Sequence, residues 1–162
     1  MVVGDHKTDT AQLFELLSNV VDPEIPVLTL QDLGVLRDIS LTDGEVKVTI
    51  TPTYAGCPAM ETMRADIETT LAQAGYDQVT VQQVLSPAWT TDWMSDNGRE
   101  KLRAYGIAPP ATTACGQPSA HIDCPQCNSS EVKLISEFGS TACKALYQCQ
   151  QCREPFDYFK CL

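Results

Sequence analysis

The stretch CPQCNSSEVKLISEFGSTACKALYQCQQC, residues 124–152, contains two C-x-x-C pairs with twenty-one residues between them. One tight turn can present the two thiolates of a pair, and a zinc ion takes four such soft ligands at the corners of a tetrahedron. Strand-like segments lie between and after the pairs, at Val132–Ser136, Ala145–Gln148 and Phe156–Phe159. A module of about forty residues often needs a metal, because its own core is small. The pattern predicts a zinc ribbon over residues 121–162, whose ligands are Cys124, Cys127, Cys149 and Cys152.

Two alternatives exist for this pattern: unrelated cysteine pairs, or a redox-active pair of the thioredoxin type. A redox pair is expected at a helix start within a βαβ unit, and neither pair lies in such a context. A closed shell of four thiolates indicates a structural site, but iron can occupy the same ligands, so the metal stays open between zinc and iron. Cys143 and Cys161 are either small buried residues or a second thiol site beside the ribbon. Cys115 is interpreted as incidental.

The residues before the ribbon alternate between helical and strand-like patterns. A helical stripe near residues 10–20 is ended by the two prolines of Asp22–Pro26. Two strands then follow, separated by the hairpin sequence Thr42-Asp-Gly44. A second helix is expected from Pro58 to Gly75 and a third strand after it. The expected strands are Val35–Leu41, Glu45–Thr51 and Val79–Leu85.

Beyond the third strand, Ser95 is a candidate N-cap for a short helix that reaches Tyr105. From there the composition changes to Pro, Ala, Thr, Gly and Ser, which is typical of a linker. We therefore expect an α/β protein with a small α-β-β-α-β domain at residues 1–105, a linker at 106–120 and the ribbon at 121–162.

The charge of the chain excludes two classes of partner. Its formal net charge is −10, and no basic face is visible for a phosphate backbone or an anionic membrane, so neither nucleic acid nor a membrane is expected as a partner. The first ten residues carry no apolar segment of the signal-peptide type. A cytoplasmic protein is therefore expected, and in a reducing compartment paired cysteines favour metal over disulfides.

Cys57 differs from the ribbon cysteines because it lies alone where the second strand meets the second helix. The positive end of a helix favours a thiolate there, and Gly56 allows a tight turn, while Thr53 has a hydroxyl to donate. A buried structural cysteine is the alternative, and the residues alone leave the two open. Nucleophilic catalysis is not expected, because His6 and His121 are both poorly placed as a base. The carboxylates of interest are Asp22, Glu24 and Asp32, whose usual role would be turn formation or capping.

At these residues the chain resembles a known family. Asp22-Pro-Glu-Ile-Pro26, Asp32-Leu-Gly34 and Thr53-Tyr-Ala-Gly-Cys-Pro58 are similar to the SufT-like domain of iron–sulfur assembly proteins, over about residues 11 to 105. The tail, at Ile135–Tyr147 and Cys152–Cys161, resembles the PaaD or PaaJ type of subunit in phenylacetyl-CoA epoxidase (phenylacetate-CoA oxygenase) systems.

The resemblance implies a non-enzymatic accessory subunit of aerobic phenylacetate degradation. It implies a maturation factor that helps insert iron or an iron–sulfur cluster, with the reductase and/or oxygenase subunits of the epoxidase system as partners. A docking subunit with no role in metal delivery is the alternative. Cys57 would be the functional thiol, and its pocket would contain Thr53, Asp22, Glu24 and Asp32.

A single thiol cannot hold a cluster alone. A transient iron–sulfur cluster would therefore need a second copy in a homodimer, Cys143 and Cys161, or the client. Zinc in the ribbon is the other expected cofactor.

Overall fold

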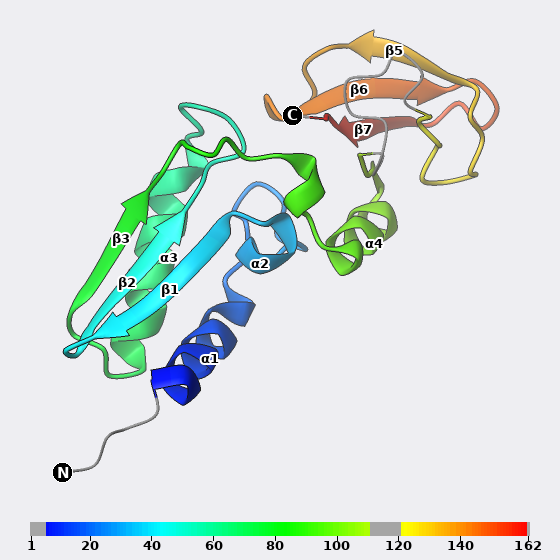
Figure 1. Ribbon diagram of the computed structural model, residues 1–162. Helices are drawn as coiled ribbons and strands as arrows, with labels where there is room; N and C mark the ends of the chain where they lie inside the picture. Colours follow the sequence, from blue (N-terminus) through cyan, green and yellow to red (C-terminus); the bar gives the residue numbers. More distant parts are fainter. Residues whose placement is uncertain (1–5, 111–120, 162) are drawn as a thin grey trace. The chain divides into compact units, whose positions relative to one another are not determined.

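The computed structural model describes residues 6–110 and 121–161, and it divides into two compact units between Trp89 and Thr90 (Figure 1). The first unit contains α1 (His6–Leu16), η1 (Leu17–Asn19), α2 (Leu30–Leu33), β1 (Leu36–Thr42), β2 (Glu45–Ile50), α3 (Ala59–Gln73) and β3 (Val79–Gln83). The expected α-β-β-α-β order is confirmed, with the short α2 added. Strand order is β1-β2-β3, where β1 and β2 are antiparallel and β2 and β3 are parallel.

Alternation along β2 explains why the sheet has one covered face. Val46, Val48 and Ile50 are fully buried, whereas Glu45 before them and Lys47 among them are exposed. The crossover helix α3 presents a matching buried stripe, and it lies against the sheet in Figure 1. These apolar faces form the core of the first unit.

The turns of the first unit follow local chemistry. Asp43 (φ 52°) and Gly44 (φ 86°) both adopt left-handed backbone between β1 and β2, as the two-residue hairpin prediction requires. Helix α2 is absent from the sequence-based expectation, although Thr29 and Asp32 form a capping box at its start. Asp32 is therefore a capping carboxylate, which is the usual role considered for it.

The second unit contains η2 (Thr91–Trp93), α4 (Asp96–Tyr105), β4 (Ile107–Ala108), β5 (Val132–Ser136), β6 (Lys144–Cys149) and β7 (Pro155–Phe159). Its sheet has the order β4-β7-β6-β5, with β4 parallel to β7 and the other pairs antiparallel. The three expected ribbon strands are present. Ser95 caps α4 as predicted, because its Oγ accepts a hydrogen bond from the Gly98 N–H at 2.9 Å.

The structure divides the chain at a different place from the predicted boundary at residue 105. Helix α4 belongs to the ribbon unit, where the Arg99 guanidinium donates to the carbonyls of Thr91 and Pro110. Within the predicted linker, Ile107 and Ala108 are buried in β4 because this short strand pairs with the outer edge of β7. Residues 111–120, which complete the predicted linker and include Cys115, lie outside the described residues.

Candidate metal centre and cysteine pocket

The four ribbon sulfurs converge on one point at the end of the second sheet. The Sγ atoms of Cys124 and Cys152 are 3.7 Å apart, those of Cys127 and Cys149 are 3.5 Å apart, and all four lie within 4.8 Å of one another. Zinc–sulfur bonds of about 2.3 Å place the corners of a tetrahedron about 3.8 Å apart. The donor set and its spacing therefore fit a tetrahedral metal ion.

Both cysteine pairs lie on turns of the same kind. The residue after each second cysteine has left-handed backbone, with φ of 60° at Asn128 and 68° at Arg153. Each turn is closed through its first cysteine: the Cys124 N–H donates to the Ser129 carbonyl at 2.9 Å, and the Cys149 N–H to the Glu154 carbonyl at 3.0 Å. Two equivalent turns thus aim two thiols each at the common centre.

Backbone N–H groups point at these sulfurs and favour their ionised form. The Cys152 N–H, which lies 3.4 Å from the sulfur of Cys149, is the main reason that the pKa of Cys149 is lowered. The Glu154 N–H acts in the same direction on Cys152, but burial and the neighbouring thiols raise the pKa of Cys152. Four thiolates this close cannot all ionise without a compensating cation, which a divalent metal supplies.

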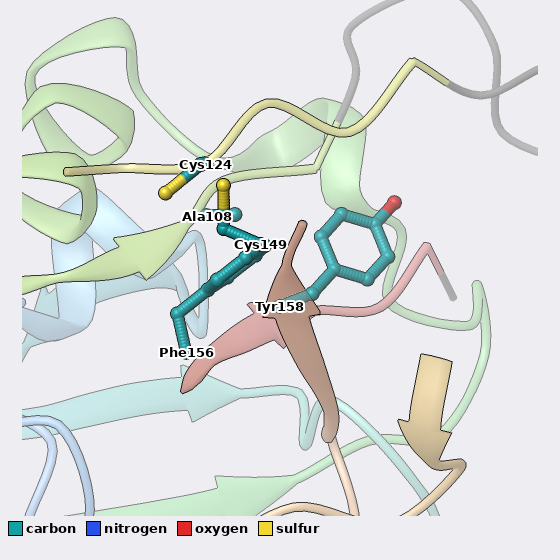
Figure 2. Packing of buried hydrophobic residues seen from close by; sticks show 5 residues of the cluster. All are labelled: Ala108, Cys124, Cys149, Phe156 and Tyr158. Carbon is teal, nitrogen blue, oxygen red and sulfur yellow. The ribbon is translucent and has the colours of Figure 1, made fainter. Parts of the chain in front are cut away.

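Two of the four ligands are embedded in the core of the ribbon. Cys124 and Cys149 pack with Ala108, Phe156 and Tyr158 (Figure 2). By contrast, Cys127 is exposed and Cys152 is half-buried, so the centre opens to solvent on one side. The predicted ligands are therefore anchored by β4, β6 and β7.

Cys57 lies in the loop between β2 and α3 and is half-buried. Its N–H donates to the Tyr54 carbonyl at 3.3 Å, and Gly56 provides the tight turn with φ of 80°. The N-cap of α3 is Pro58, so Cys57 does not cap this helix.

The expectation that the helix start favours ionisation of Cys57 is not met. Burial raises the pKa of the thiol above its ordinary value, although the Ala59 N–H and the Tyr54 side chain act in the opposite direction. The carboxylates of Glu24 and Asp22 raise the pKa further. At neutral pH this thiol is therefore mainly protonated until a cation or a base displaces its proton.

The same electrostatic effect indicates that Asp22 and Glu24 lie near Cys57. The Asp22 Oδ1 also accepts from the backbone N–H groups of Glu24 at 2.6 Å and Ile25 at 2.9 Å, so it forms a turn as well. Thr53 lines a neighbouring hollow of about 140 Å³ with Tyr54 and other side chains of the first unit. Within the part of the chain that the structure describes, only the ribbon cysteines form a ready group of three or more metal ligands.

Comparison with known proteins places both units in families. Residues 10–83 match the family described as iron-sulfur cluster assembly protein, and residues 108–160 match the PaaD zinc beta ribbon domain. The chain is 51% identical over 152 residues to the D component of a putative 1,2-phenylacetyl-CoA epoxidase of Escherichia coli (strain K12), and the match covers 93% of this chain and 92% of that protein. The chain belongs to the PaaD family.

Other proteins match only the first unit of this PaaD-family chain. An Fe-S protein maturation auxiliary factor of Porphyromonas gingivalis is 33% identical over 92 residues, which are 56% of this chain and 87% of that protein. The crystal structure of the domain of unknown function DUF59 from Bacillus anthracis has a TM-score of 0.56 at 24% identity, covering 60% of this chain and 93% of that one. This last likeness supports the fold of the first unit.

Two further cysteines of the described ribbon unit, Cys143 and Cys161, are not among the four converging sulfurs. Cys143 is buried, and its sulfur lies 3.0 Å from the Thr141 Oγ1. Cys161 is disulfide-bonded and therefore offers no thiolate here. A second thiol site at these residues stays a prediction.

Tyr54 is a site residue that the sequence reasoning misses. It lies inside the Thr53–Pro58 motif, which is the signal that could have found it, and its side chain lowers the pKa of Cys57 through a hydrogen bond.

Among the described residues, no helix is both long and apolar enough to cross a membrane.

Proposed function

We propose that this chain is a maturation factor that helps insert iron or an iron–sulfur cluster into a phenylacetyl-CoA epoxidase system. The observation that carries the proposal is the half-buried Cys57 beside two carboxylates, within the region that matches iron–sulfur cluster assembly proteins. The names of its relatives, a putative epoxidase component and a maturation auxiliary factor, support the same role.

Cys57 is suited to the transfer of iron or an iron–sulfur cluster to a client protein. A thiolate is a soft ligand for iron, and the carboxylates of Asp22 and Glu24, which raise the pKa of the thiol, attract a multivalent iron cation more strongly than a single proton. Because one thiol completes no coordination shell, iron or a cluster held here needs further ligands from a client or from a second copy. Incomplete coordination makes the binding transient, which is what delivery requires.

The ribbon has a separate role in this proposal. We assign zinc to its four cysteines because the sulfur spacing fits and the matched domain is described as a zinc ribbon. With four protein ligands the ion keeps no open position, so zinc supplies cross-linking of the two turns rather than chemistry. In this proposal the ribbon binds the partner subunit, and Cys57 transfers the iron or the cluster.

A docking subunit without metal delivery is the second candidate function. It is favoured by exposed apolar side chains on the ribbon, at Leu134, Ile135 and Phe138. Several aromatic side chains are less suitable for docking, because they are buried: Trp89, Phe156, Tyr158 and Phe159.

Complementation separates the two candidates. A strain that lacks this protein is supplied with the wild type, Cys57→Ala, or the matched control Cys143→Ala, and its epoxidase activity is measured at equal protein levels. The maturation proposal expects Cys57→Ala to lose most activity and Cys143→Ala to retain it, whereas loss of activity with both variants would assign Cys143 to the delivery site as well. Full activity with Cys57→Ala would remove the proposed delivery mechanism and leave the docking function.

A further inference from the structure

Apolar side chains gather at one edge of the ribbon. In the described part of the chain the exposed large hydrophobic residues are Leu85, Tyr105, Leu134, Ile135 and Phe138. The last three fall within residues 134–138, and Phe138 is 66% exposed. Such clustering is uncommon on a surface that contacts only water, since isolated exposed apolar residues are the norm.

The same residues lie on or beside an open strand edge. Strand β5 ends the sheet order β4-β7-β6-β5, so β6 covers only one of its sides. The Gln150 N–H donates to the Glu131 carbonyl at 2.7 Å, which sets the phase of the antiparallel ladder. The register is regular from Val132 to Leu134 and shifts between Leu134 and Ser136, so the alternation is counted only as far as Leu134, whose backbone N–H and C=O then point away from β6. An extended chain can pair with groups presented in this way.

Beside this edge lies a groove of about 310 Å³, here called the ribbon groove. Tyr158 on its wall is also part of the buried cluster under the metal centre, so the groove is the uncovered continuation of that apolar core. Its volume is at the lower limit for small-molecule sites, which suits one or two side chains and is small for a CoA thioester. Its lining consists of Leu134, Glu137, Phe138, Ala145, Tyr147, Tyr158 and Lys160.

A positive charge marks the rim of the ribbon groove. The Lys160 Nζ lies 4.7 Å from the centre of the Phe138 ring and donates to the Glu137 carbonyl at 3.1 Å. The ion pairs His121–Asp123 and Lys144–Asp157 of the same unit do not involve this ammonium group. Its charge and its remaining N–H donors therefore favour a carboxylate on whatever fills the groove.

We propose that the ribbon groove binds an extended segment of a client subunit, which pairs with β5, inserts an apolar side chain and places a carboxylate on Lys160. Backbone pairing supplies affinity in this mode, and the pocket supplies specificity. A second copy fits less well, because two copies of a chain whose formal net charge is −10 repel each other. The inference rests on the proposed function only for the source of the client.

The test measures binding directly with full-length protein and, as separate probes, the purified reductase and oxygenase subunits of the epoxidase system. The variants are Phe138→Ala and Lys160→Glu, and Tyr105→Ala is a matched control because it removes another exposed aromatic ring from the same unit. Metal content and melting temperature are checked for each. We expect at least a roughly tenfold loss of affinity for both groove variants and no change for the control. Hydrogen exchange should slow at the Leu134 amide when the client binds.

Three outcomes overturn the inference. They are no binding of either subunit to the wild type, unchanged affinity of the groove variants, and a dimer in solution that Phe138→Ala dissociates. The last outcome would assign the groove to a second copy. Because iron is not the readout, the maturation proposal can fail or stand independently of these results.

Discussion

Removing one ribbon ligand tests the metal centre quantitatively. Cys149→Ser replaces a buried thiol that lies 3.5 Å from the sulfur of Cys127 and packs in the cluster with Phe156. Structural zinc sites bind with about 10–16 kcal/mol at neutral pH, and a quarter of that energy corresponds to roughly a hundred- to a thousand-fold in affinity. We therefore expect Cys149→Ser to bind zinc weaker by about this factor and to destabilise the ribbon unit.

The assay is competition of the purified protein with a coloured zinc chelator, together with metal analysis and thermal melting. Cys143→Ser is the matched control, because it changes a buried thiol of the same unit that lies outside the converging sulfurs. Cys149 is not a zinc ligand if Cys149→Ser keeps wild-type zinc affinity, and the four-sulfur site is wrong if Cys143→Ser loses zinc to the same degree.

Three further predictions concern the first unit. Asp22→Ala removes a carboxylate that accepts two backbone N–H groups, so urea unfolding should show about 2–4 kcal/mol lower stability. Because the pKa of Cys57 is raised, its alkylation by iodoacetamide should be slow at neutral pH and should accelerate as pH rises. Glu24→Gln should speed the alkylation at fixed pH, because it lowers the pKa of Cys57. An unchanged rate in Glu24→Gln would contradict the placement of Glu24 near Cys57. Trp89→Phe removes the indole N–H that donates to the Leu33 carbonyl at 3.0 Å, and a cost of about 1–3 kcal/mol is expected in the same urea assay.

Much of the fold follows from short-range patterns. The alternation in β2 and the stripe of α3 each reflect one covered face, and the Asp43–Gly44 turn reflects local backbone preference, so all three could be predicted. The doubled C-x-x-C spacing is equally local within each turn. The convergence of the two pairs then follows because few folds bring such turns together other than around a metal.

Other features depend on contacts that the sequence pattern does not carry. Strand β4 has two residues and forms only because it pairs with β7, far along the chain. The local composition, rich in Pro and Ala, is that of a linker and does not predict this strand. Helix α2 is short enough that its capping box, between Thr29 and Asp32, is the only local signal for it. The pKa of Cys57 rises because burial outweighs the helix end, and burial is a tertiary property.

Delivery of iron or a cluster to an epoxidase system is the function proposed for this chain. Its most direct test measures iron and acid-labile sulfide in the oxygenase and reductase components, purified from cells with and without the protein. We expect iron or sulfide to fall selectively in the absence of this protein, and the depleted component identifies the client. Unchanged occupancy in both components, together with lost activity, would contradict maturation and favour the docking function.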